Sequence, residues 1–235
     1  MQKKLIFIFI LVFSVMGLWS QESTKYKVPL IGEQAPSFKA QSTNGAISFP
    51  GDYAGKWKIL FSHPKDFTPI CSSEILELAQ KQNDFTKLNV QLVVVSVDAV
   101  ERHKDWKKAL EEISYKDRSP VAINFPLVDD QNLFIAKAYG MLHYPVTTQR
   151  DVRGVFVVDP ANTIRAVFFY PMEIGRNLDE IERTVIALQT HDSQHVLTPA
   201  NWKPGEDVFL PYKDSINIDP KVYQISWFMI AKKMD

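Results

Sequence analysis

Residues 57–74 read WKILFSHPKDFTPICSSE, in which an apolar run leads through a proline-bounded loop to a cysteine and the start of a helical pattern. The apolar run predicts a β-strand. Pro64 and Pro69 restrict the backbone between this strand and Cys71. Apolar residues then recur at helical spacing over 72–88, which places Cys71 in or just before the first turn of a helix. This strand–loop–helix unit is the starting point for predicting the fold.

Cys71 is the only cysteine in the chain, so no internal disulfide can form. A lone thiol is either a buried small hydrophobe or a reactive group. A helix N-terminus presents free N–H donors and partial positive charge, and both favour the thiolate over the thiol. The hydroxyl of Thr68 stands three residues before the sulfur. These surroundings favour a nucleophile over an inert core residue.

The remaining patterns alternate between strand and helix. The nearly continuous apolar run at 92–97 predicts a strand buried on both faces. Asp98 is expected to cap the next helix, with Val100, Trp106, Leu110 and Ile113 on its inner face. Asn44-Gly45 predicts a hairpin, further strands are expected at 123–128, 154–158 and 164–169, and further helices at 131–139 and 177–189. This order predicts an α/β fold, with a thioredoxin-like mixed sheet flanked by helices.

The N-terminus is a separate segment. A pair of lysines precedes the apolar stretch 5–19, and Ser20 follows it. This pattern predicts a signal peptide at 1–22, cleaved after Ser20, and therefore an exported protein, periplasmic or secreted. Leu18 does not match the small residue expected three positions before the cleavage point, so an uncleaved anchor is the alternative.

The C-terminal part also differs in texture. A main domain is predicted at 28–190. After it, prolines break the chain into short pieces rich in aromatic residues. This texture predicts a small C-terminal module at 191–235, which packs on its own core or on a partner subunit.

Charge excludes some partners. Lys+Arg and Asp+Glu each number 27, which gives a formal net charge of zero. Such a balance does not favour binding to nucleic acid or, beyond the signal segment, to a membrane surface. Small molecules and other proteins are the expected partners.

The loop before Cys71 has the features that a thiol peroxidase needs. Such an enzyme requires an ionised sulfur, a hydrogen-bonding group that orients and polarises the O–O bond, and a tight prearranged pocket. The Thr68 hydroxyl can accept from a peroxide, the N–H groups of Ile70 and Cys71 can point into the same space, and Pro64 can shield it. An arginine from elsewhere in the chain would supply the cation.

Pro64, Thr68 and Cys71 match the Pro-x-x-x-Thr-x-x-Cys signature of the peroxiredoxins, and the sequence resembles that family. His63 and the surrounding residues are similar to the one-cysteine, peroxiredoxin-6-like branch. The resemblance extends over roughly residues 28–212 and is carried further by RGVFVVDP at 153–160, YP at 170–171, GRN at 175–177 and TPANW at 198–202.

The resemblance implies roles for particular residues. Cys71 would be the peroxidatic nucleophile, Thr68 and Arg153 would orient the peroxide and stabilise the thiolate, and Pro64 would shield the sulfenic acid. Arg150 competes with Arg153 for this assignment. Glu74 would hold the arginine, and His63 and Arg176 would support the site. Three alternatives stay open. Thr68 would only cap a turn, Glu74 would only favour the helix N-terminus, or His63 would be structural.

The same resemblance predicts a reaction that needs no cofactor and no metal. Hydrogen peroxide and organic hydroperoxides would oxidise Cys71 to a reversible sulfenic acid. The chain has no second cysteine, so an external thiol or a thioredoxin-like protein must act as reductant. A homodimer or a higher oligomer is expected.

Two departures and two rivals limit this prediction. Residues 54–58 read AGKWK, without the serine of the lipase-like Gly-x-Ser-x-Gly motif found in some members of the branch, so a phospholipase activity is not predicted. The tail after Pro211 also departs from the pattern of the branch. A redox-sensing holdase or assembly switch would use the same cysteine without sustained turnover. A thioredoxin-like disulfide oxidoreductase is disfavoured because the chain has no Cys-x-x-Cys pair.

Overall fold

The computed structural model describes residues 27–147, 149–211 and 220–234. The predicted signal peptide at 1–22 lies outside these residues. In the part of the chain that is described, no helix has both the length and the apolar character that a membrane crossing requires.

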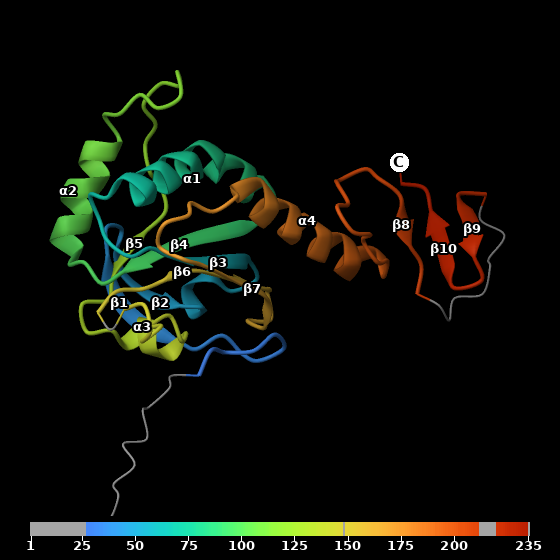
Figure 1. Ribbon diagram of the computed structural model, residues 1–235, viewed down its shortest axis with the longest axis horizontal. Helices are drawn as coiled ribbons and strands as arrows, with labels where there is room; N and C mark the ends of the chain where they lie inside the picture. Colours follow the sequence, from blue (N-terminus) through green and yellow to red (C-terminus); the bar gives the residue numbers. More distant parts are fainter. Residues whose placement is uncertain (1–26, 148, 212–219, 235) are drawn as a thin grey trace, which may run out of the picture.

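Within the described residues, seven strands form one mixed sheet in the order β2-β1-β5-β4-β3-β6-β7 (Figure 1). The strands are β1 (Phe38–Ser42), β2 (Gly45–Phe49), β3 (Trp57–Ser62), β4 (Val90–Ser96), β5 (Leu127–Asp129), β6 (Arg153–Val158) and β7 (Ile164–Tyr170). The central strand β3 runs parallel to β4 and antiparallel to β6. The predicted thioredoxin-like mixed sheet is confirmed.

Helices cover both faces of the sheet. Helices α1 (Pro69–Lys87), α2 (Val100–Leu110) and α4 (Leu178–Gln194) share one buried cluster, whereas α3 (Phe134–Ala138) packs in another; a 3₁₀ turn, η1 (Gly51–Tyr53), follows β2. Figure 1 shows α1 above the sheet, α2 at its upper left and α3 below it. Ile59 and Phe61 of β3 belong to the first cluster and Leu60 to the second, as the alternation of side chains along a strand requires.

A smaller sheet forms the C-terminal module. Its strands are β8 (Val208–Phe209), β9 (Val222–Ser226) and β10 (Met229–Lys232), in the order β8-β10-β9. They lie beyond the end of α4 (Figure 1). Trp202 is buried against residues of α4 and β8. The predicted boundary between residues 190 and 191 falls within α4.

The start of α2 differs from the prediction. Ala99, not Asp98, is its N-cap, and the Ala99 side chain makes no capping hydrogen bond. The Asp98 carboxylate instead accepts from the backbone N–H of Asp66 at 2.7 Å and lies 3.1 Å from Nε of Arg102. Ile113 was predicted on the inner face, but the helix ends before it and its side chain is 41% exposed.

Two other elements are shorter than predicted. The strand expected at 123–128 comprises only Leu127–Asp129, and Pro126 before it has no N–H to donate to a ladder. The helix expected at 131–139 begins at Phe134, because Leu133 adopts a left-handed conformation with φ 57°. The N–H groups at the start of this helix donate to the carboxylate of Asp130.

Candidate active site

Sheet topology creates the site at the end of β3. Phe61 of β3 is paired with Val155 of β6, and the two strands are antiparallel. The first residue of β6, Arg153, therefore lies beside the loop that leaves β3. Gly154 permits this close approach, because a Cβ at that position would lie 3.1 Å from Oγ of Ser62.

Cys71 lies in the first turn of α1, as predicted. Thr68 is the N-cap, and Pro69 occupies the first helical position, where the missing N–H costs no helical hydrogen bond. The first intrahelical bond runs from Ser72 N–H to the Thr68 carbonyl at 2.9 Å. The N–H groups of this first turn have no acceptor within the helix, and Cys71, which belongs to the same turn, is 1% exposed.

Arg153 reaches the sulfur. Its Nη1 donates to Sγ of Cys71 at 3.3 Å and to Oε2 of Glu74 at 2.7 Å. Its Nε and Nη2 donate to the Met172 carbonyl at 3.1 and 2.7 Å. The Arg153 side chain is 3% exposed. The hydrogen bonds to Glu74 and to the Met172 carbonyl hold its guanidinium on two sides and direct it at the thiol. Arg150, the competing candidate, lies on the exposed surface.

Glu74 joins two arginines. Besides Arg153, its carboxylate accepts from Nε and Nη2 of Arg176 at 2.9 and 2.7 Å, and from the Arg176 backbone N–H at 2.8 Å. Burial by itself would raise the pKa of Glu74, but the hydrogen bonds and charge of Arg176, with the charge of Arg153, outweigh burial and lower it. Glu74 is thus an ionised buried carboxylate.

Arg176 connects this carboxylate to the sheet. Its Nη1 donates to the carbonyls of Ser62 and Gly154 at 2.7 and 2.9 Å. Its guanidinium carbon lies 3.2 Å from the ring centroid of Phe61. These contacts fix Glu74, and through it Arg153, against the ends of β3 and β6.

Thr68 and Pro64 shape the loop. The Thr68 hydroxyl donates to the Lys65 carbonyl at 3.0 Å, which leaves the lone pairs of its oxygen to accept another hydrogen bond. Thr68 is half-buried and Pro64 is buried. The structure therefore links Cys71, Arg153, Glu74 and Arg176 in one series of hydrogen bonds, and places Thr68 and Pro64 in the loop just before Cys71.

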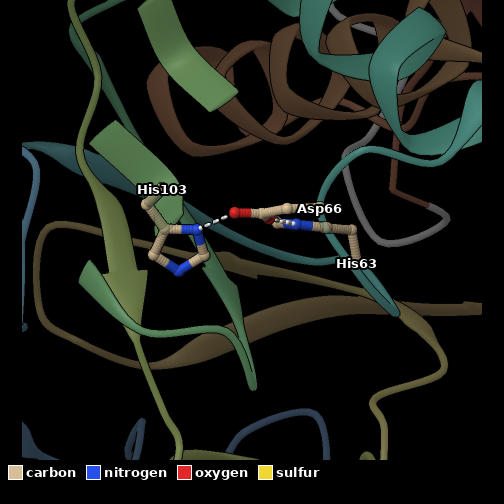
Figure 2. Close-up of side chains that lie close together, drawn as sticks. All are labelled: His63, Asp66 and His103. Carbon is tan, nitrogen blue, oxygen red and sulfur yellow. Dashed lines mark hydrogen bonds and ion pairs between the residues drawn. The ribbon is translucent and has the colours of Figure 1, made fainter. Parts of the chain in front are cut away.

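The sequence prediction missed Asp66 and His103, two buried residues near this loop. His63 is hydrogen bonded to Asp66, and Asp66 is hydrogen bonded to His103 of α2 (Figure 2). Asp66 lies inside the Pro64–Cys71 motif, but no role was predicted for it. His103 comes from an element 37 residues further along the chain, and nothing in the local sequence links it to the loop.

A cavity of about 620 Å³ lies elsewhere, between the β1–β2 hairpin and residues 129–135. The three carboxylates that line it all accept from backbone N–H groups: Asp52 from that of Ser48, Asp129 from those of Val100 and Gln131, and Asp130 from those of Ile135 and Ala136. The reactive groups around Cys71 are not among its lining residues.

Comparison with known proteins agrees with this geometry. A model described as the AhpC/TSA family matches residues 31–167, and one described as the C-terminal domain of 1-Cys peroxiredoxin matches residues 187–217. A protein of Methanosarcina mazei named peroxiredoxin is 44% identical over 215 residues, with 88% of this chain and 98% of the relative covered. The chain belongs to the peroxiredoxin family.

Two solved structures extend the comparison. A yeast mitochondrial 1-Cys peroxiredoxin is 36% identical, with a TM-score of 0.78 and coverage of 87% of this peroxiredoxin and 99% of that chain. A cysteine-to-serine mutant of peroxiredoxin 6 from Arenicola marina is 26% identical, with a TM-score of 0.77 and coverage of 88% and 98%. The family and the fold together support a thiol-dependent peroxidase of the 1-Cys type.

Proposed function

We propose that this peroxiredoxin reduces hydrogen peroxide and small organic hydroperoxides through a sulfenic acid on Cys71, and that an external thiol regenerates it. The observation that carries the proposal is the hydrogen bond from Arg153 Nη1 to Cys71 Sγ at 3.3 Å. A guanidinium at that distance, together with the N-terminus of α1, stabilises negative charge on sulfur.

The oxidative step uses these groups in turn. The Cys71 thiolate attacks one peroxide oxygen, an S–O bond forms and the O–O bond breaks. The attacked oxygen stays on sulfur as Cys71–SOH, and the other leaves as hydroxide or alkoxide and takes up a proton to give water or an alcohol. Thr68 accepts from the peroxide O–H, and Arg153 stabilises the charge that develops on the departing oxygen.

The reductive step needs outside thiols, because the only cysteine of the chain is already used. One thiol attacks the sulfenic sulfur and releases water, which leaves a mixed disulfide on Cys71. A second thiol attacks this disulfide and restores the Cys71 thiol, so two thiols become one disulfide. The related yeast 1-Cys peroxiredoxin has a thiol resolving mechanism that works via the glutathione and thioredoxin systems, which supports a reductant of this kind.

Burial limits what can reach the sulfur. Cys71 is only 1% exposed, so we expect the hydroperoxide group of a substrate to reach it while a bulky substituent stays outside. The two loops that carry Thr68 and Arg176 also carry exposed apolar side chains, Phe67 at 50% and Ile174 at 55%. These surfaces favour organic hydroperoxides as well as hydrogen peroxide.

Location and assembly complete the proposal. The pattern at residues 1–22 supports export, to a periplasm or out of the cell. An exported protein would draw its reductant from outside the cytoplasm. We expect a homodimer or a higher oligomer.

The direct test is Cys71→Ser in a peroxide-consumption assay with excess thiol. We expect turnover to disappear and the circular dichroism spectrum to stay unchanged, with Ser193→Ala on the exposed side of α4 as control. Mass spectrometry after one equivalent of peroxide should show a single added oxygen on Cys71 of the wild type. Sustained peroxide consumption by Cys71→Ser would refute the proposal; one equivalent consumed by the wild type, followed by assembly, would indicate the redox-switch alternative.

A further inference from the structure

A second buried polar cluster, His63, Asp66 and His103, joins the Cys71 loop to α2 (Figure 2). Asp66 lies between two imidazoles: its Oδ1 is 2.7 Å from Nε2 of His63, and its Oδ2 is 2.7 Å from Nδ1 of His103. All three side chains are at most 1% exposed. Hydrogen bonds between buried groups must match donors to acceptors, so the positions of the protons follow from the partners.

Each ring nitrogen of His103 faces an oxygen atom, one from Asp66 and one from Val128. Its Nε2 lies 3.0 Å from the Val128 carbonyl, which can only accept. Burial alone would raise the pKa of Asp66, but hydrogen bonds from His103 and His63 outweigh burial and lower it, so Asp66 is an ionised carboxylate that also only accepts. With Asp66 ionised, both partners of His103 accept, so both of its ring nitrogens donate, as in an imidazolium.

His63 takes the complementary state. Burial lowers the pKa of His63, in opposition to the carboxylate of Asp66 and with small contributions from His103 and Arg176, so its ring is neutral. Its single proton lies on Nε2, which donates to Asp66. Its Nδ1 carries a bare lone pair and, among the described residues, is buried without a hydrogen-bond partner. The cluster as a whole has no net charge, as burial favours.

The same residue types could hold a metal ion, but the distances fit protons. Two ligands of a tetrahedral zinc, each about 2.0–2.1 Å from the metal, lie about 3.4 Å apart. The nitrogen–oxygen distances here are 2.7 Å, the length of charge-assisted hydrogen bonds.

The cluster also holds a strained backbone. Phe67, directly after Asp66, has φ 58°, a left-handed conformation that is costly for an aromatic residue. The Asp66 N–H donates to Asp98 at 2.7 Å, and the guanidinium of Arg102 lies 4.9 Å from the ring centroid of Phe67. The ring of Trp106 packs against that of His63, with 5.0 Å between the centroids. Residues of α2 and its N-terminal flank thus hold the loop on several sides.

We propose that Asp66 and His103 are positioning residues of the peroxidase site: their buried ion pair fixes the Nε2–H tautomer of His63 and holds loop 63–68 in the strained form that presents Thr68 and Cys71. The bare Nδ1 of His63 is then the ring nitrogen of the cluster that is left to accept from a water or substrate O–H. This inference rests on the proposed function for its catalytic consequence, but the proton positions can be tested separately.

The first experiment is ¹⁵N NMR of the full chain labelled at histidine, recorded near pH 7 without peroxide. We expect an imidazolium signature for His103 and, for His63, a protonated Nε2 with a bare Nδ1. Asp66→Asn should disturb the His63 signature, because an amide offers one acceptor and one donor group to the two rings. A neutral His103, or a His63 protonated on Nδ1, would overturn the proposal whether or not the protein reduces peroxide.

The second experiment compares peroxide reaction rates of His103→Leu and His103→Gln. Leucine removes both hydrogen bonds and should lower the rate constant about a hundredfold, the scale of a reacting group misplaced by about 1 Å. Glutamine keeps a donor toward Asp66 and should recover about tenfold of that loss. Lys104→Ala, an exposed neighbour on α2, is the control and should not change the rate.

The two variants are read together with the NMR. If His103→Leu does not fold, His103→Gln must show both the slower reaction and an altered His63 tautomer. Rates within twofold of wild type for the folded variants, or a slower reaction with an unchanged His63 signature, would count against a positioning role. If the wild type itself fails to turn over, the proposed function fails, and the NMR result still decides the proton positions.

Discussion

Two buried carboxylates flank Cys71 in the sequence, Asp66 in the loop and Glu74 in α1, and each lies between two basic side chains. The partners of Glu74 are guanidiniums, which keep their charge at any working pH. The partners of Asp66 are imidazoles, the side chains that titrate closest to neutrality. The charge beside the sulfur is therefore permanent, whereas the charge that holds the loop depends on bound protons.

The two clusters also act on different parts of the site. The Glu74 cluster reaches the sulfur itself through Arg153. The Asp66 cluster acts on the backbone, through the segment that contains the left-handed Phe67. Loss of the first should impair chemistry and stability together, and loss of the second mainly the geometry of the loop.

Of the variants that test this comparison, Glu74→Gln should have the largest effect on stability and on the peroxide rate. It leaves Arg153 and Arg176 buried without a counter-charge, so the free energy of unfolding should fall by about 3–5 kcal/mol. The peroxide rate should fall at least a hundredfold, because Arg153 loses the group that aims it. Urea unfolding and stopped-flow kinetics measure the two effects. Glu182→Gln, which breaks a partly exposed pair with Lys81, is the control and should cost about 1 kcal/mol or less.

The pH dependence of stability provides a second reading of the same variant. The folded pKa of Glu74 is lowered, so its contribution is present above the unfolded pKa, about 4.3, and is lost as pH falls toward the folded value. Glu74→Gln should therefore flatten the acid limb of the stability curve. An acid limb as steep as that of the wild type would show that other carboxylates dominate it.

Thr68→Val should have an intermediate effect, confined to chemistry. In the proposed mechanism the Thr68 hydroxyl accepts from the peroxide, so its loss should lower the peroxide rate about a hundredfold. Losing the hydrogen bond from this half-buried hydroxyl to the Lys65 carbonyl should lower the free energy of unfolding by only about 1 kcal/mol. Thr86→Val is a matched control, since the Thr86 hydroxyl also donates to a backbone carbonyl, that of Gln82 in α1. A rate for Thr68→Val within twofold of wild type would remove Thr68 from the mechanism.

Asp151→Asn tests the opposite case and should have the smallest effect. Asp151 is fully buried, and neither carboxylate oxygen has a hydrogen-bond partner in the described part of the chain. Burial, with the charge of Asp130, raises the pKa of Asp151 well above its ordinary value. Stability from this group is therefore complete below the unfolded pKa, about 3.9, and is lost as pH rises through the folded value.

At neutral pH the amide should therefore raise the melting temperature, by about 2–4 °C for a gain of about 1 kcal/mol. Melting curves across the acid to neutral range measure this, with exposed Asp105→Asn as control. A lower melting temperature at neutral pH would mean that the Asp151 carboxylate has a partner that stabilises its charge.

Much of the fold follows from local pattern. Strand β3, the first turn of α1 at Cys71 and the strands β6 and β7 were predicted close to their observed positions, because each depends on residues near in sequence. The error at Asp98 arose because its carboxylate accepts from the distant N–H of Asp66 instead of capping α2. The other two errors have local causes, the left-handed backbone of Leu133 and the missing N–H of Pro126. The strand–loop–helix motif also identified Thr68 and Cys71 as a pair, since so short a stretch of chain cannot separate them far.

Only the tertiary structure decided how the distant charges meet. Arg153 lies 82 residues from Cys71, and it reaches the sulfur because β6 runs antiparallel beside β3. The same is true of the hydrogen bonds between Arg176 and Glu74 and between His103 and Asp66, which depend on which strands and helices pack together. Pattern in a sequence reports each residue's near neighbours, whereas a hydrogen bond between buried charges requires atoms within about 3 Å, a condition that sheet order and helix packing impose.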